Sequence, residues 1–320
     1  MNKVFFGDCR ESMREMIAQG IKAQMCVTSP PYFGLRDYGH PGQLGLEATP
    51  AEFVANMVEV FRMVRDVLAD DGVLWLNLGD SYAGGGGHSP NAPSSATSKS
   101  GKYGDALKSG GIKPQGTIKP KDLIGIPWRV AFALQADGWY LRQDIIWHKP
   151  NPMPESVTDR CTKAHEYIFL LSKNERYYFD HEAIKETVAA GTAERYEYGF
   201  GKAEKKAAIV ESGHWHTGKD GRDNLCGEMK FDEKRNKRSV WTVATTPYSG
   251  AHFATFPPAL IEPCIMAGSK PGDIVLDPFF GSGTTGQVSQ ALGRQWIGCE
   301  LNPAYEPLQL KRTAQGGLAL

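Results

Sequence analysis

The stretch DIVLDPFFGSGTTG, residues 273–286, joins a short apolar strand, a glycine-rich turn and the start of a helix. Glycines allow a ligand to approach the backbone closely, and the first turn of a helix offers unpaired amide donors to the polar end of that ligand. Glu300 closes the next apolar run, which is where doubly wound folds place an acid for ribose hydroxyls. The stretch therefore predicts an α/β fold with a nucleotide-type cofactor at one edge of its sheet.

The glycine spacing by itself leaves the kind of cofactor open. A phosphate-binding P-loop requires a lysine after its last glycine, and no lysine follows here. Gly281, Gly283 and Gly286 match the dinucleotide pattern G-x-G-x-x-G. NAD and a plain tight turn therefore both remain alternatives on the glycines alone.

The rest of the chain alternates strand and helix signals in the same α/β manner. Thr49 and Glu52 form a capping-box pattern around Pro50, which predicts a helix over about 50–69. A buried strand is expected at 73–78. The remaining expected elements are a helix capped by Asp122 that ends at Gly138, strands at 139–147 and 166–171, a helix at about 257–267, and strands at 273–277 and 295–300.

A second unusual turn, Ser29-Pro30-Pro31-Tyr32, directly follows the apolar run 25–27. The two prolines cannot continue strand pairing, so the strand ends abruptly there. A proline turn alone is common loop chemistry. This turn gains meaning because, like the glycine turn, it stands at the carboxyl end of an expected strand.

The two turns together resemble the DNA methyltransferases that modify exocyclic amino groups. The turn at 29–32 is similar to motif IV of that family, and residues 277–285 are similar to motif I, which binds S-adenosylmethionine. Because the proline turn comes first, the order resembles the beta class. That resemblance implies a circularly permuted, Rossmann-like fold with a doubly wound, mostly parallel sheet. It places catalytic parts at 1–184 and 246–320 and a target-recognition insert at 185–245.

The resemblance also implies which residues bind S-adenosylmethionine. Asp8 is similar to an acid that faces the adenine, residues 255–257 to a motif that closes over the methionine end, and Glu300 to the ribose acid. The implied cofactor residues are Asp8, Thr255, Phe256, Pro257, Asp277, Phe279, Gly281, Ser282, Gly283, Thr284, Thr285 and Glu300.

The proline turn is expected to carry the chemistry. The amino group of adenine or cytosine is a poor nucleophile because its lone pair is delocalised into the ring. Acceptors for both of its hydrogens favour a tetrahedral nitrogen, and Ser29 Oγ and the Pro30 carbonyl are the candidates. Pro30 and Pro31 hold that carbonyl in a fixed direction, and Tyr32 is expected to stack on the base. The base must be flipped out of the duplex first, and no cysteine nucleophile is needed.

The net charge is zero, with 36 basic and 36 acidic residues, which argues against a generic polycationic chromatin protein but not against a local basic face. Residues 81–121 hold six lysines against one aspartate, which favours a loop that clamps the phosphate backbone of DNA. A solvated surface loop is an equal alternative. The expected DNA-binding residues are Lys99, Lys102, Lys108, Lys113, Trp147, Lys149, His214, His216, Lys234, Arg235, Lys237 and Arg238. The resemblance further implies a homodimer bound to double-stranded DNA.

Several other classes of protein are disfavoured. No apolar run reaches the length of a membrane span. The six cysteines are dispersed without a C-x-x-C pair, so neither a metal site nor a disulfide framework is expected. Their dispersal instead favours a bacterial or phage protein that acts in the cytoplasm. Methylation of RNA or of protein glutamine, and a DNA-binding regulator without catalysis, remain alternatives. The sequence leaves both the recognition site and the choice of adenine or cytosine undecided.

Overall fold

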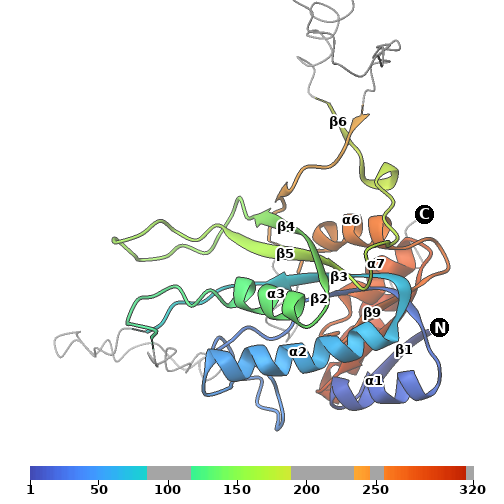
Figure 1. Cartoon of the computed structure of the whole chain (residues 1–320), viewed down its shortest axis with the longest axis horizontal. Coiled ribbons are helices and arrows are strands. Elements are labelled where there is room, and N and C mark those ends of the chain that lie inside the picture. Colours follow the sequence, from blue (N-terminus) through green and yellow to red (C-terminus); the bar gives the residue numbers. More distant parts are fainter. Residues whose placement is uncertain (85–116, 189–233, 246–255, 315–320) are drawn as a thin grey trace, which may run out of the picture. The chain divides into compact units, whose positions relative to one another are not determined.

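The computed structural model describes residues 1–84, 117–188, 234–245 and 256–314. The chain divides into two compact units, one formed by Met1–Asp180 with Ser239–Leu320 and the other by His181–Arg238. The larger unit contains one sheet with helices packed against it (Figure 1). The smaller unit contains the 3-10 helix η1 (Glu182–Ile184) and an antiparallel pair of short strands, β6 (Glu186–Thr187) and β7 (Lys234–Arg235).

The sheet of the larger unit has eight strands in the order β1-β10-β9-β2-β3-β5-β4-β8. Its strands are β1 (Asn2–Phe6), β2 (Ala23–Thr28), β3 (Leu68–Leu78), β4 (Tyr140–His148), β5 (His165–Ser172), β8 (Val240–Thr242), β9 (Ile274–Asp277) and β10 (Gln295–Glu300). The first five strands in that order run parallel, whereas β5 is antiparallel to both β3 and β4. This arrangement confirms the predicted α/β fold with a mostly parallel sheet.

Helices cover both faces of this sheet (Figure 1). They are α1 (Cys9–Ala18), α2 (Pro50–Val67), α3 (Ile126–Ala136), α6 (Pro258–Gly268), α7 (Thr284–Ala291) and α8 (Glu306–Ala314), and the 3-10 turn η2 (Pro303–Tyr305) precedes the last. The predicted capping box of α2 is present, because Thr49 Oγ1 accepts from Glu52 N and Glu52 Oε2 accepts from Thr49 N, each at 3.1 Å. No described helix is long and apolar enough to span a bilayer.

Alternating side chains of the central strands build two apolar layers. Helices α1, α2 and α3 pack in series over a core that includes Cys26, Leu74 and Leu76. Helices α6 and α7 contact each other, and α6 lies against the opposite face. There Gly268 lies so close to the sheet that an added Cβ would come within 3.0 Å of Met25 Sδ. Because strand side chains alternate between faces, every central strand is buried on both sides.

Two predicted details are wrong. Asp122 does not cap α3, since that helix begins at Ile126 after Gly125, which has a left-handed φ of 77°. Asp80 at the end of β3 accepts the amide hydrogens of Gly125 and Ile126 instead, so an acid distant in sequence replaces the local one. The insert predicted at 185–245 also extends too far, because β8 belongs to the large sheet beside β4. The sequence did not indicate β8, because its three residues are too few to show the alternation of a strand.

Candidate active site

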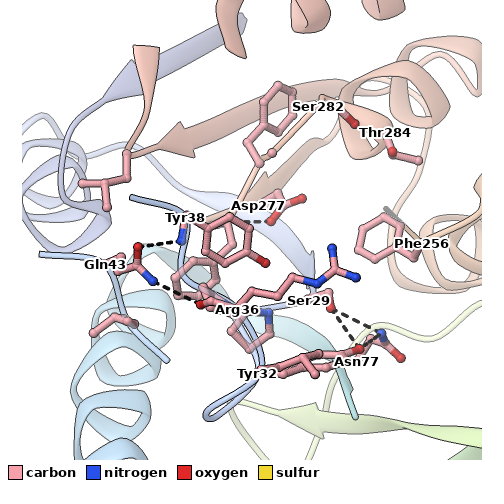
Figure 2. A pocket seen from close by; sticks show the side chains of 18 of the residues that line it. Ser29, Tyr32, Arg36, Tyr38, Gln43, Asn77, Phe256, Asp277, Ser282 and Thr284 are labelled. Carbon is pink, nitrogen blue, oxygen red and sulfur yellow. Dashed lines mark hydrogen bonds between the residues drawn. The ribbon is translucent and has the colours of Figure 1, made fainter. Parts of the chain in front are cut away.

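A cavity of about 1010 Å³ opens at the carboxyl ends of β1, β2, β9 and β10. The loops that follow these four strands line it, together with side chains from β3, β4 and β5. Figure 2 shows the proline turn with Ser29, Tyr32 and Asn77 at one side, and the glycine turn with Ser282 and Thr284 at the other. In open α/β sheets this edge is where ligands bind.

Asp277 fastens the two turns to each other. Its Oδ1 accepts a hydrogen bond from Thr28 Oγ1, the residue before the proline turn, at 2.6 Å, and another from the Phe279 amide at 3.0 Å. Its Oδ2 accepts from Thr285 Oγ1 at 2.6 Å. Burial raises the pKa of Asp277 to about 6. The carboxylate that the sequence assigned to the cofactor is thus already engaged by the protein on both oxygens.

Glu300 is bound from both sides by backbone amides. Its Oε2 accepts from Gly281 N at 2.8 Å, and its Oε1 accepts from Asn302 N at 2.9 Å. Burial raises the pKa of Glu300 to about 7. The carboxylate lines the cavity, and each oxygen of a carboxylate has a second lone pair that can accept a hydroxyl. The position therefore suits an acid that holds ribose hydroxyls.

The glycine turn rests on an aromatic ring. Gly281 and Gly283 have left-handed φ values of 52° and 87°, which side chains disfavour. Phe280 is buried beneath the turn and stacks on Trp296 with ring centroids 5.0 Å apart. An added Cβ on Gly286 would come within 2.8 Å of the Phe280 ring. The third glycine of the pattern thus serves close packing of helix and strand.

Arg312 of α8 completes this turn, although the sequence did not single it out. Its Nη1 donates to Ser282 Oγ at 2.6 Å and also to Thr284 Oγ1. Both hydroxyls were assigned to the cofactor, and in the structure they also fix the turn to the last helix. No local signal marks Arg312, because it lies in an ordinary polar helix far along the chain from the turn it contacts.

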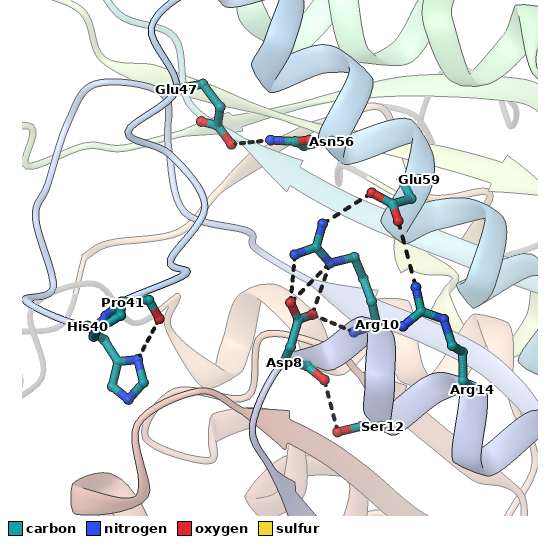
Figure 3. A network of polar contacts seen from close by, with 9 residues as sticks. All are labelled: Asp8, Arg10, Ser12, Arg14, His40, Pro41, Glu47, Asn56 and Glu59. Carbon is teal, nitrogen blue, oxygen red and sulfur yellow. Dashed lines mark hydrogen bonds and ion pairs between the residues drawn. The ribbon is translucent and has the colours of Figure 1, made fainter.

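Asp8 lies at the start of α1 and lines the cavity. Figure 3 shows its carboxylate paired with Arg10, with Nη2 and Oδ2 2.6 Å apart, while Arg10 also pairs with Glu59 at 3.1 Å. The Arg10 guanidinium lowers the pKa of Asp8. A Cβ added to the neighbouring Gly7, whose φ is 121°, would meet no atom within 4 Å, so this wall of the cavity is open.

The proline turn belongs to a polar cluster. Tyr32 Oη donates to Glu166 Oε2 at 2.5 Å, and Asn77 Nδ2 lies 2.9 Å from Tyr32 Oη and 3.3 Å from Ser29 Oγ. Lys149 Nζ pairs with Glu166 Oε1. Sequence reasoning missed Asn77 and Glu166. The available signal was an asparagine near the end of the apolar run 73–78 and an acid directly before the apolar run 167–171.

The comparisons with known proteins agree with this geometry. A family model described as DNA methylase, of the N6 and N4 type, matches residues 23–311. The chain belongs to the N6/N4 DNA methylase family.

Relatives within this family are similar over most of their length. The chain is 45% identical over 311 residues to the Type II methyltransferase M.Cfr9I of Citrobacter freundii, covering 97% of this chain and 86% of that protein. It is 46% identical to M.SmaI of Serratia marcescens, covering 97% and 90%. The crystal structure of the cytosine-N4-specific PvuII DNA methyltransferase shares the fold, with a TM-score of 0.59, 18% identity and coverage of 97% and 86%.

The methylase is therefore an S-adenosylmethionine-dependent enzyme that methylates an exocyclic amino group, N6 of adenine or N4 of cytosine, at specific sites in DNA. The structure of the M1.HpyAVI complex with S-adenosylmethionine has the same fold, with a TM-score of 0.52 and 18% identity over 98% of this chain and 100% of that one. The described residues suit this cofactor: the open wall at Gly7, the left-handed glycine turn and the acceptor Glu300 surround one cavity. Among described residues no cluster could hold a metal ion.

Some of the remaining predicted site residues of the methylase line the cavity, and others lie outside the described residues. Pro30, Pro31, Phe256 and Phe279 line the cavity, and Pro257 precedes α6. Trp147 is buried, with its indole Nε1 donating to the Val243 carbonyl at 2.8 Å, and Lys149 Nζ lies 4.3 Å from the centre of its ring. Both Trp147 and Lys149 also line the cavity. Thr255, Lys99, Lys102, Lys108, Lys113, His214 and His216 lie outside the described residues.

The basic run 234–238 belongs to the smaller unit. Arg235 Nε and Arg238 Nε lie 3.0 Å and 2.6 Å from the same Glu186 Oε1, and Lys234 is in strand β7. Lys237 follows in the same segment. An acid of the same unit thus contacts two of the predicted DNA-binding cations.

Proposed function

We propose that the chain methylates a base that has been flipped out of duplex DNA into the cavity, with Ser29 and Pro30 as acceptors for the amino hydrogens. The observation that carries this proposal is that Asp277 ties the proline turn and the glycine turn to one cavity. A base buried in a duplex cannot reach such a recess. Flipping places its amino group beside the cofactor.

The chain's own residues prepare the amino nitrogen for reaction. Ser29 Oγ and the Pro30 carbonyl accept its two hydrogens, which draws the lone pair out of the ring. When bound, S-adenosylmethionine supplies an electrophilic methyl group on a sulfonium. Tyr32, whose ring lies against Gly79, would stack on the base. Glu300, which lines the cavity, would accept the ribose hydroxyls of the cofactor.

Recognition of the DNA sequence belongs, in this proposal, to the insert that contains 185–238, and its basic residues contact phosphates. We propose that the enzyme acts as a homodimer in the bacterial cytoplasm, beside a restriction enzyme with the same site. The pairing with a restriction enzyme is supported by the name Type II methyltransferase that relatives from Citrobacter and Serratia carry. Light scattering of the purified chain, alone and with DNA, tests the dimer.

Incubation with S-adenosylmethionine labelled on its methyl group and with unmethylated genomic duplex DNA tests the reaction. The expected result is label in DNA, recovered after digestion as N4-methylcytosine or N6-methyladenine by mass spectrometry. Which nucleoside appears decides the target base. Label in RNA or in protein glutamine, or no transfer at all, would contradict the proposal.

Ser29→Ala and Asp137→Asn form the matched pair for this assay. Ser29→Ala should lower transfer at least 100-fold while affinity for the cofactor stays within twofold. Asp137 pairs with Arg62 on α2 and does not line the cavity, so its variant should transfer at the wild-type rate. Full activity of Ser29→Ala would show that the active-site assignment is wrong.

A further inference from the structure

The polar cluster behind the proline turn spans four elements. Ser29 and Tyr32 come from the turn, Asn77 from β3 and Glu166 from β5, and Lys149 follows β4. All five residues line the cavity. Asn77 is 5% exposed, and the side chains of Lys149 and Glu166 are 18% and 14% exposed. Figure 2 shows the hydrogen bonds that join Ser29, Tyr32 and Asn77.

Chemistry fixes the direction of the hydrogen bonds in this cluster. Lys149 only donates, and an ionised Glu166 only accepts. The Tyr32 hydroxyl therefore gives its hydrogen to Glu166 Oε2 at 2.5 Å, and it is free to accept from the Ser29 hydroxyl at 3.4 Å. Burial and the nearby Glu166 carboxylate raise the pKa of Tyr32 well above its usual value, so the phenol stays protonated.

The orientation of the Asn77 amide supports the same direction. With Nδ2 toward the cluster, its two hydrogens face three acceptors: Tyr32 Oη at 2.9 Å, Glu166 Oε2 at 3.1 Å and Ser29 Oγ at 3.3 Å. The reversed amide would place Oδ1 against the Glu166 carboxylate with no hydrogen between the two oxygens. Ser29 Oγ gives its own hydrogen to Tyr32, and at most one of its lone pairs accepts from Asn77. A remaining lone pair is available to a donor in the cavity.

The proposed reaction requires a proton acceptor. As the amino lone pair forms the N–CH₃ bond, the S–CH₃ bond breaks, the sulfur leaves as a neutral thioether, and the nitrogen carries a positive charge until it loses a proton. A serine hydroxyl is too weak a base to keep that proton. A carboxylate is basic enough, and Glu166 is the carboxylate joined to Ser29 by the hydrogen bonds described above.

We propose that Glu166 is a positioning residue that acts through Tyr32 and Ser29: it orients the Ser29 lone pair toward the amino group and is the final acceptor of its proton. The amino proton moves to Ser29 Oγ, the Ser29 proton to Tyr32 Oη, and the Tyr32 proton to Glu166 Oε2. Neither Ser29 nor Tyr32 retains a charge. Lys149 balances the charge of Glu166 before the transfer. This inference rests on the proposed function.

The test is the rate of a single turnover, measured with enzyme in excess over unmethylated genomic duplex DNA and with saturating labelled S-adenosylmethionine, from pH 5 to pH 9. The wild-type rate should fall at acid pH, because a proton path stops when its final acceptor already holds a proton. Glu166→Gln should be at least 30-fold slower at pH 7.5 and should lack this acid limb. Its affinity for S-adenosylmethionine should stay within twofold. Asp137→Asn is the control for loss of a paired carboxylate and should match the wild type.

Tyr32→Phe interrupts the same path at its middle and provides an independent measurement. It too should lose the acid limb, and the double variant with Glu166→Gln should be no slower than the slower single variant, because both act on one path. If Glu166→Gln does not fold, Tyr32→Phe and the wild type still carry the test. The inference would be overturned if Glu166→Gln reacted within threefold of the wild-type rate, or if either variant were slow but kept an unchanged acid limb. Absence of transfer by the wild type would instead reject the proposed function.

Discussion

The cofactor side of the cavity, formed by the glycine turn, and the target side, formed by the proline turn, share one packing arrangement. On each side an aromatic ring from a loop packs on a glycine in or directly after the neighbouring strand: Phe280 on Gly298 of β10, and Tyr32 on Gly79 after β3. The Phe280 side chain has no polar atom and stacks on Trp296. Tyr32 in contrast carries a hydroxyl that enters the polar cluster with Glu166.

In the proposed function, this difference separates the side of the cavity that binds the cofactor from the side where the base reacts. The cofactor side uses backbone amides and buried acids whose partners are fixed by the fold, as with Gly281 and Glu300. The target side uses polar side chains that hydrogen-bond to one another, as in the contacts of Tyr32 with Glu166 and Ser29. Breaking either side should therefore give distinct kinetic losses.

Gly298→Ala is expected to have the largest effect. A Cβ there would overlap the Phe280 ring, which is buried and cannot move without moving the glycine turn. We expect the free energy of unfolding to fall by about 2–3 kcal/mol and cofactor binding to be lost. Urea unfolding and calorimetric titration with S-adenosylmethionine measure both. Unchanged cofactor affinity would show that the turn does not depend on this packing.

Gly79→Ala makes the same substitution on the target side. A Cβ there would overlap the Tyr32 ring and pull its hydroxyl away from Glu166 and Asn77. The rate of methyl transfer should fall about 100-fold, equivalent to about 2.7 kcal/mol, with cofactor affinity within twofold of wild type. Each glycine variant is the control for the other. Equal loss of cofactor affinity in both would remove the distinction between the two sides.

Asp277, which joins the two sides, gives a test by pH. Its pKa rises from 3.8 to about 6 on folding, so between these values the folded state still holds a proton that the unfolded state has lost. The contribution of Asp277 to stability should therefore decrease as pH rises from about 4 to 6, with a slope of up to about 1.4 kcal/mol per pH unit.

Asp277→Asn removes this titration, and its amide can donate to Thr285 Oγ1, as a protonated carboxyl would. The variant should lose stability less steeply than the wild type over the same range, as measured by urea unfolding at successive pH values. Glu300 titrates in both proteins, and the Asp277 charge is only a minor cause of its raised pKa, so the difference between the two curves comes mainly from Asp277. Parallel curves would mean that Asp277 does not gain a proton on folding.

Glu300→Gln should have the smallest effect, confined to the cofactor side. Both oxygens of Glu300 accept from backbone amides, so a glutamine would turn its own amide hydrogens toward one of those donors. The dissociation constant for S-adenosylmethionine should rise about tenfold, or about 1.4 kcal/mol. The transfer rate at saturating cofactor should stay within twofold. A change in that rate with no change in affinity would place Glu300 in the chemistry instead.

Local patterns were sufficient for much of the molecule. The capping box at Thr49, the two turns and the acid at Glu300 are each legible within a few residues, because capping, left-handed turns and strand ends depend on neighbouring chain. The prediction that Asp122 caps α3 was wrong for the opposite reason. Asp80 reaches that helix from the end of β3, and no local pattern shows such a contact.

The amino-acid sequence alone determined the α/β fold, the family resemblance, the cofactor and the presence of the proline turn. Only the tertiary structure decided what joins them. Thr28 and Asp277 are 249 positions apart, and Tyr32 and Glu166 are 134 apart, yet each pair is hydrogen-bonded. The physical reason is that a parallel sheet gathers the ends of distant strands at one edge. Side chains without any shared local pattern, such as Asn77, Glu166 and Arg312, become neighbours only once the sheet has formed.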